Sequence, residues 1–190
     1  EGSQKLSKTF YKRFAYRGLL DDAIYWINAN TAVDIDGDGV LDSGIIDDNN
    51  LSVSHVINQI KAEESSSKNG PLYIYMVDHG SDGAFKISGN DVDGDGNAEI
   101  LYASQLKEAL NAFVTQTSRD VIVMIEASQS GSFISTLTDS MTSDKIAVVT
   151  SSEAEQLSYI GKFGNISFTK FLADELLFGK TLSEAVIDAT

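Results

Sequence analysis

The sequence lacks cysteine and is poor in histidine, and both shortages limit its chemistry. None of its 190 residues is cysteine, which excludes disulfide bonds, thiolate zinc sites and a cysteine nucleophile in the chain as it stands. Only His55 and His79 carry imidazole groups, so a multi-histidine metal site is not expected.

Basic residues and long apolar runs are also scarce. The net charge of −14 at pH 7 argues against binding to nucleic acid or to an anionic membrane surface. No stretch reaches the roughly 18 apolar residues that a membrane span requires. A hydrophobic content of 42% over 190 residues instead predicts one globular domain with a sizeable core.

What is present alternates between strand-like and helix-like segments. Apolar runs rich in β-branched residues predict buried strands, and apolar residues three and four apart predict helices. This alternation predicts an α/β fold with a mainly parallel sheet and helices on both faces. We expect strands at 23–27, 72–77, 121–125 and 145–150, a hairpin at 85–87 and 98–102, and helices at 7–20, 51–60, 104–114 (capped by Ser104), 133–137, 168–178 and after the Thr181–Glu184 capping box.

Three of these strands end in polar residues. Right-handed crossovers place the carboxyl ends of parallel strands at one edge of the sheet, where ligands and catalytic groups lie. The ends in question carry His79, Ser128 and the pair Ser151-Ser152. A hydroxyl nucleophile with an imidazole in reach is the minimum apparatus for covalent acyl transfer.

The segments around these residues resemble a peptidase family. The run Leu72–Gly80 is similar to the hydrophobic strand and His-Gly motif of clan CD cysteine peptidases, and Glu126–Ser132 resembles the Glu-Ala-Cys-x-Ser-Gly-Ser motif of their legumain-like (C13) branch. His79 precedes Ser128 by 49 residues, close to the spacing of about 50 in caspases. The chain resembles bacterial C13-like peptidases with caspase-type folds, which implies a caspase-like three-layer α/β/α sandwich with a small hairpin insertion.

The resemblance also implies roles for individual residues. His79 would be the catalytic imidazole, Ser128 holds the nucleophile position, and the backbone N–H groups of Gly80 and Ser128 would form the oxyanion hole. Pairing of Ser151–Glu153 with an extended peptide would be β-augmentation. The other positions that match the substrate pocket are Gln129, Ser158 and Asn165. Gln129 replaces a pocket carboxylate, and the pocket arginine falls at Ser7 or Lys8, so the residue preferred before the scissile bond stays open.

Serine at the nucleophile position is the largest departure from the family. A serine hydroxyl ionises far less readily than a thiol, whose unperturbed pKa is near 8.5, and it needs a closely bonded base with an orienting acid. We therefore expect an inactive or severely impaired chain. Either an engineered Cys-to-Ser change that prevents self-cleavage or a natural pseudopeptidase explains Ser128, and the intact motif around it favours the first.

Two acidic loops share one pattern. Alternate carboxylates followed by a glycine suit a hard cation, as in Asp34-x-Asp36-x-Asp38-Gly39-x-x-Asp42 and Asp91-x-Asp93-x-Asp95-Gly96-x-x-Glu99. Val40 and Asn97 would supply backbone carbonyls. Neither loop has the glutamate of an EF-hand at position 12, where Ile45 and Tyr102 stand. The loops, inserted at about 34–48 and 91–99, predict two calcium sites without an organic cofactor, and a secreted, extracellular or periplasmic bacterial protein.

Three functions remain open at this stage. The first is a calcium-binding cysteine endopeptidase whose substrate is a peptide or protein, including its own precursor. The second is a non-catalytic pseudopeptidase that binds peptides, and the third is a calcium-dependent extracellular adhesion module. We expect one peptidase domain over residues 1–190, truncated before the first strand of the fold.

Overall fold

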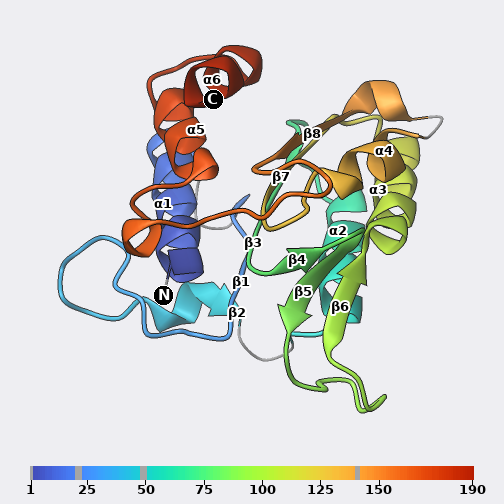
Figure 1. Ribbon diagram of the computed structural model, residues 1–190, viewed down its shortest axis with the longest axis horizontal. Helices are drawn as coiled ribbons and strands as arrows, with labels where there is room; N and C mark the ends of the chain where they lie inside the picture. The colour runs from blue at the N-terminus through green and yellow to red at the C-terminus, as the bar shows by residue number, and fades with distance from the viewer. Residues whose placement is uncertain (1, 20–22, 48–50, 140–141) are drawn as a thin grey trace. The chain divides into compact units, whose positions relative to one another are not determined.

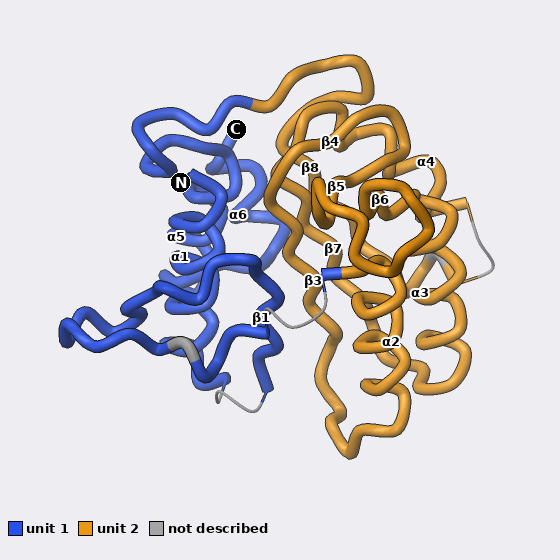
Figure 2. The backbone as a smooth tube through the Cα atoms, turned by 90° about the horizontal axis from the view of Figure 1, so that it is seen from below, with its two compact units in different colours: residues 1–51, 159–190 blue, residues 52–158 orange. Residues whose placement is uncertain are grey.

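The computed structural model describes residues 2–19, 23–47, 51–139 and 142–190 (Figure 1). Residue 20, the expected end of the first helix, and residue 48, the expected end of the first acidic insertion, lie outside these ranges. The chain forms two compact units, one of Glu1–Leu51 with Tyr159–Thr190 and one of Ser52–Ser158 (Figure 2). The expectation of one domain over the whole chain stays a prediction.

The larger unit, Ser52–Ser158, is built on a parallel sheet. Strands β3 (Leu72–Val77) and β8 (Ile146–Thr150) flank β7 (Val121–Glu126), and both pair with it in parallel. The expected run at 72–77 matches β3 at both ends, and β7 and β8 each differ by one residue. These elements confirm the α/β class with a mainly parallel central sheet, consistent with a caspase-like sandwich.

Helices α2 (Val53–Glu64), α3 (Ala103–Thr117) and α4 (Ser132–Thr138) complete the core of this unit. Their apolar faces pack against the inward side chains of the sheet. The shared core includes Leu106, Leu110 and Phe113 of α3 and Val121, Val123 and Ile125 of β7. Met124 and Glu126, which alternate with those β7 residues, are fully buried as well. The central strand is therefore buried on both faces, as its unbroken apolar run predicts.

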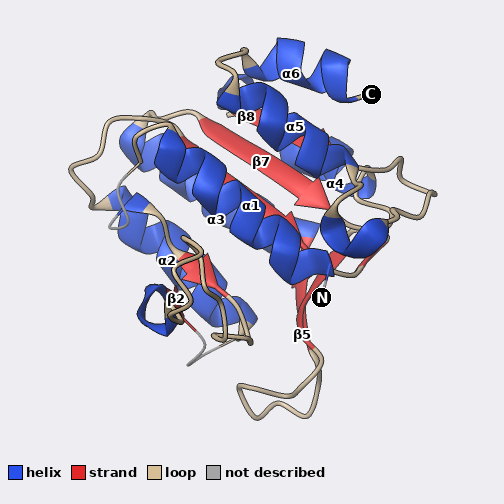
Figure 3. Ribbon diagram, turned by 90° about the vertical axis from the view of Figure 1, so that its left-hand side faces the viewer, coloured by secondary structure: helices blue, strands red, loops and turns tan. Residues whose placement is uncertain are grey.

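A three-stranded antiparallel sheet extends the larger unit. It consists of β4 (Gly80–Ser81), β5 (Ala84–Ser88) and β6 (Glu99–Tyr102), joined in that order. Strands β5 and β6 confirm the expected hairpin, and their connection is a long loop that projects from the sheet (Figure 3). The two-residue strand β4 was not expected.

The expected helix cap at Ser104 is wrong. Helix α3 begins at Ala103, directly after β6, and the backbone N–H of Tyr102 donates to the Gln105 side chain over 2.9 Å. No loop separates strand from helix, so the chain turns one residue earlier and leaves Ser104 exposed inside the first turn.

The smaller unit contains α1 (Gly2–Tyr16), α5 (Phe168–Leu177) and α6 (Leu182–Ala189), with the short parallel pair β1 (Trp26–Ile27) and β2 (Ile46–Asp47). The Thr181–Glu184 capping box is present at the start of α6. Helix α1 begins five residues before its expected start and ends at Tyr16. None of the helices in the described ranges is long and apolar enough to cross a membrane.

An ion pair joins α1 to α5 within the smaller unit. The Arg13 guanidinium lies 2.8 Å from Asp174 Oδ1, and Lys170 also binds this carboxylate. Burial raises the pKa of Asp174, but the hydrogen bonds from Lys170 and Arg13 lower it by more, so the pKa is below its ordinary value. The pair therefore stabilises the fold while Asp174 is ionised.

We predict that Asp174→Asn lowers the free energy of unfolding at neutral pH by about 1–2 kcal/mol. Because the folded-state pKa is depressed, the advantage of the unsubstituted chain is complete above the unfolded-state value, near 4, and disappears as pH falls through the folded-state value. Urea unfolding from pH 7 to pH 3 measures this difference, with Asp144→Asn, an exposed aspartate, as the charge-matched control. Equal stability of Asp174→Asn and the control at pH 7 would contradict the prediction.

Candidate functional site

The pairing of β3 with β7 sets the positions of the two catalytic candidates. The register runs from Leu72↔Val121 to Val77↔Glu126, a constant offset of 49 residues. His79 and Ser128, which are separated by the same 49 residues in sequence, each lie two residues beyond the last pair. The strand register therefore brings the two turns to the same level at the carboxyl edge of the sheet.

Gly80 brings the two turns into contact. A Cβ atom at this position would lie 2.5 Å from the carbonyl oxygen of Ser128 and 2.9 Å from the Ala127 Cβ. Such distances are far inside van der Waals contact, so only glycine fits without a shift of the backbone. The turn that carries His79 thus rests directly on the turn that carries Ser128.

The His79 imidazole projects into solvent, with 85% of its side chain exposed. Its backbone is better held, because the His79 carbonyl accepts from the Lys86 N–H at 3.0 Å and the His79 N–H donates to Asp78 Oδ1 at 2.8 Å. Asp78 Oδ1 also lies 3.8 Å from His79 Nε2. Sequence reasoning assigned no role to Asp78, although its place beside the histidine was a usable signal.

Ser128 lies in a tight turn after β7. Its Oγ accepts a hydrogen bond from the Ser158 N–H at 3.2 Å. Gln129, the next residue, has φ of 57°, a left-handed conformation that is rare for residues other than glycine, and its N–H donates to the Gln156 carbonyl at 2.6 Å. Within the described ranges, the Ser128 N–H has no hydrogen-bond acceptor in the protein.

A buried carboxylate supports this turn from below. Ser151 Oγ donates to Ser158 Oγ at 2.9 Å, and Ser158 Oγ donates to Glu126 Oε1 at 2.5 Å. Ser151 Oγ also accepts from the Ala127 N–H at 3.2 Å. Glu126 is 1% exposed, so Ser151 and Ser158 point inward, and sequence reasoning missed Glu126 as a member of the site. A charged residue inside an apolar strand was the available signal.

Ser152 is bound to the same turn by its backbone and its side chain. Its Oγ donates to the Ala127 carbonyl at 3.0 Å, its N–H donates to Ser130 Oγ at 3.2 Å, and its carbonyl accepts from the Gly131 N–H at 2.9 Å. These bonds occupy the groups that β-augmentation by Ser152 would need. Pairing of this segment with a peptide stays a prediction, and the contacts of Ser152 weigh against its own part in it.

The remaining pocket candidates differ in location. Gln129 is half-buried in the turn beside Ser128. Asn165 is exposed in the smaller unit, where its N–H donates to the Lys162 carbonyl over 3.3 Å. The role predicted for Asn165 beside the pocket therefore stays a prediction.

The two acidic loops have the same hydrogen-bond pattern. In each loop, the carboxylate of the first residue accepts hydrogen bonds from the backbone N–H groups of the fourth and sixth residues. The carboxylates of the third and fifth residues accept from the N–H groups of the fifth and seventh residues, respectively. The carboxylate of the ninth residue accepts from the N–H group of the second. The glycines at the fourth and sixth positions all have φ near 87–88°. The sequence repeat is therefore also a structural repeat. At the seventh position, the N–H groups of Val40 and Asn97 make equivalent hydrogen bonds in the two loops.

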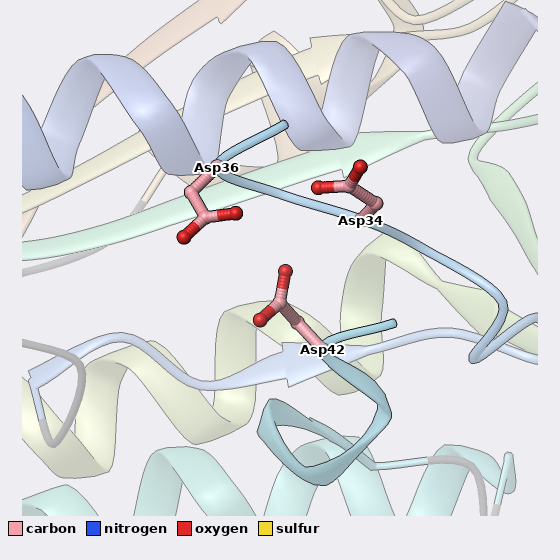
Figure 4. A group of neighbouring side chains, drawn as sticks. All are labelled: Asp34, Asp36 and Asp42. Atoms are coloured by element: carbon pink, nitrogen blue, oxygen red, sulfur yellow. The ribbon is translucent and has the colours of Figure 1, made fainter. Parts of the chain in front are cut away.

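Three carboxylates converge in each loop. Oxygen atoms of Asp34, Asp36 and Asp42 lie within 4.8 Å of one another, and their side chains point toward a common centre (Figure 4). In the second loop the converging set is Asp91, Asp93 and Asp95. The hydrogen bond from the Gly37 N–H lowers the pKa of Asp34 and outweighs burial, which raises it.

Two of the predicted carboxylate ligands, Asp38 and Glu99, lie outside these sets. Asp38 Oδ1 accepts from the Val40 N–H at 2.7 Å. Glu99 is buried, and its carboxylate accepts from the N–H groups of Val53, Val92 and Asp93 at 2.9–3.3 Å. Glu99 therefore connects the second loop to the first residue of α2, and its role as a metal ligand stays a prediction.

A protein-family model matches most of the chain. No curated protein matches the chain. The model of the peptidase C13 family matches residues 47–185, which include the His79 turn, the Ser128 turn and the whole larger unit. Because this match spans more than half of the sequence and agrees with the resemblance of the two motifs, the chain belongs to the peptidase C13 family, the legumain-like branch of clan CD.

Proposed function

We propose that this chain has the active site of a cysteine-type endopeptidase with serine at the nucleophile position. Membership of the peptidase C13 family makes it a peptidase-type hydrolase. The assignment of residues rests on the register of β3 and β7, which end together at the pair Val77↔Glu126, and on the packing of Gly80 against the Ser128 carbonyl. This geometry supports a dyad of His79 and the side chain at position 128.

With cysteine at position 128, the reaction would proceed through an acyl-enzyme. The thiolate attacks the scissile carbonyl carbon, and the N–H groups of Gly80 and residue 128 stabilise the oxyanion. His79 gives a proton to the leaving amine and then accepts one from the water that hydrolyses the thioester. The Ser158 N–H, which faces the nucleophile atom, would stabilise the thiolate before attack.

Serine in the same place lacks what a hydroxyl nucleophile needs. An effective serine site holds its histidine with a buried carboxylate. Here the carboxylate beside His79 is Asp78, whose side chain is 44% exposed, and the imidazole is 85% exposed. We therefore propose an inactive or severely impaired chain, whose Ser128 is explained by an engineered change or by a natural pseudopeptidase that binds peptides.

The substrate class follows from the family: a peptide or protein, with the chain's own precursor as one candidate. We also propose that the protein acts outside the cytoplasm, in the extracellular or periplasmic space of a bacterium. There calcium is abundant enough, at millimolar levels, to fill weak sites.

The acidic loops support a proposal of two calcium sites. Carboxylate oxygens and backbone carbonyls are the ligands that Ca²⁺ prefers, and three carboxylates in each loop lie within 4.8 Å of one another. Without a cation, their mutual repulsion would disfavour this arrangement. The alternative of a calcium-dependent adhesion module rests on the same loops and would leave the His79 and Ser128 turns without a role.

We predict that Ser128→Cys gives measurable endopeptidase activity against a peptide library or against the chain itself. Adding His79→Ala should lower that activity by about 10²- to 10⁴-fold. His55→Ala is the matched control, because His55 lies in α2 and should not affect turnover. Peptide binding without turnover would favour the pseudopeptidase, and neither binding nor turnover would favour the adhesion module.

Calcium titration of the whole chain by calorimetry should give a stoichiometry of about two, one ion for each loop. Asp36→Asn and Asp93→Asn each remove one converging carboxylate and should each reduce the stoichiometry to about one. The asparagine oxygen keeps the hydrogen bond inside the loop, so the loss is specific to charge. Glu108→Gln, on the exposed face of α3, is the control, and heat of binding that is the same in all variants would exclude these sites.

We further predict that calcium at the second loop controls peptidase activity. This loop closes the β5–β6 hairpin, and β5 pairs with β4, which begins next to His79. Chelation, or Asp93→Asn, should therefore reduce the activity of the Ser128→Cys chain, whereas Asp36→Asn should reduce it less. Activity that survives chelation unchanged would disprove this control.

A further inference from the structure

Ser132 connects the two catalytic turns through one oxygen atom. Its Oγ accepts from the Gly83 N–H at 2.8 Å and donates to the Gln129 carbonyl at 2.6 Å. Gly83 belongs to the turn between β4 and β5, four residues after His79. Gln129 directly follows Ser128, so a single hydroxyl binds the loop of the imidazole and the loop of the nucleophile.

The directions of these bonds are fixed by chemistry. A hydroxyl has one proton, and the Gln129 carbonyl can only accept it. The remaining lone pairs then face the Gly83 N–H, which can only donate. Among the described residues, the bond from the Gly83 N–H to Ser132 Oγ is the one hydrogen bond between residues 78–83 and residues 128–132.

Ser132 lies at the start of a helix that is anchored in the core. It is the first residue of α4, and the following Phe133 and the later Leu137 are at most 1% exposed in the core. The Ser132 N–H also donates to the Gln129 carbonyl at 3.0 Å. The buried Phe133 and Leu137 thus fix the backbone that carries Ser132, and a group on a fixed backbone can hold other groups to within a fraction of an ångström.

The Gly80 contact makes that precision matter. A Cβ at Gly80 would lie 2.5 Å from the Ser128 carbonyl oxygen, so the two turns are closely packed, and without the Ser132 bond they can separate. Separation would displace the Gly80 N–H and His79 from the atom at position 128. Misplacement of reacting groups by about 1 Å can cost up to about 100-fold in rate.

From this geometry we propose that Ser132 is a positioning residue, which holds the His79–Gly83 loop against the nucleophile turn. This role rests on the proposed peptidase function. Ser132 Oγ bonds Gly83 and Gln129, and neither His79 nor Ser128, so its loss should reduce kcat and leave KM nearly unchanged. It should also alter the pH dependence of the nucleophile, because the imidazolium that stabilises a thiolate moves away.

The test compares Ser132→Ala, Ser132→Thr and Ser135→Ala, each in the Ser128→Cys chain. Ser132→Ala should lower kcat by about 10- to 100-fold and move the acid limb of the pH–rate profile to higher pH. Ser132→Thr keeps the hydroxyl and should restore kcat to within about threefold of the parent. Ser135, exposed on the same helix, controls for effects on α4. A kcat and pH profile in Ser132→Ala that match those of Ser135→Ala would overturn the proposal.

A second readout separates this role from the peptidase function. The pH dependence of iodoacetamide alkylation at the introduced thiol requires no substrate, and it should shift in Ser132→Ala even if no peptide is cleaved. Such a shift without cleavage would sustain the positioning role and refute the peptidase. Cleavage that is insensitive to Ser132→Ala would refute the positioning role and sustain the peptidase function.

Hydrogen exchange of the unsubstituted chain removes the risk that Ser132→Ala fails to fold. The Gly83 amide should exchange at least about tenfold more slowly than an unprotected amide, because its acceptor is the Ser132 hydroxyl. Protection should be kept in Ser132→Thr. Free exchange at Gly83 in the unsubstituted chain would refute the bond and the role together.

Discussion

The parallel pairing of β3 with β7 is the constraint on which the site depends. Alternate β7 residues, Val121, Val123 and Ile125, are fully buried against α2 and α3, while Met124 and Glu126 fill the opposite face. A slip of one residue would exchange these two sets and bury side chains of the wrong shape on both faces. Core packing therefore fixes the register, and the offset of 49 residues places His79 level with Ser128. The geometry of the site is therefore determined by hydrophobic packing in the core of the larger unit.

Small residues let the turns above this sheet approach one another. A Cβ at Gly131 would lie 2.7–2.8 Å from backbone atoms of Ser152, Glu153 and Ala154, which repeats the close contact of Gly80 with Ser128. Hydroxyl groups then satisfy backbone groups that such close packing removes from water. Ser130 and Ser152 bond each other at 3.1 Å, and Ser158 carries the chain of bonds down to Glu126. The serines at these strand ends are structural members of the site, since their oxygens replace the water that would otherwise bind the turns.

Much of this could be predicted from sequence because it follows from local pattern and parallel topology. The apolar runs at 72–77 and 121–125 are long enough to identify buried strands, and the edge rule for parallel sheets brings His79 and Ser128 together. The roles of Asp78, Glu126 and Ser132 depend on which backbone groups lie opposite them, and no periodicity encodes that. Strand β4 has two residues and therefore no pattern at all. The early start of α1 was missed because its first two turns contain one buried apolar residue, Leu6, among polar neighbours that show little periodicity.

The two acidic loops have the same local structure but are anchored to different elements of the fold. In the first loop, Ile35 and the preceding Val33 are buried in the core of the smaller unit, in one cluster with Tyr11 of α1 and Trp26 of β1. In the second, Glu99 is buried under the hairpin and receives the N–H of Val53 at the start of α2. We therefore expect a change of charge in the first loop to act on α1 and β1. We expect the same change in the second loop to act on β5 and β6, and through the β4–β5 pairing on the backbone of His79. Sequence and hydrogen-bond pattern are shared, so we expect any difference in function between the loops to come from the elements to which their ends are anchored.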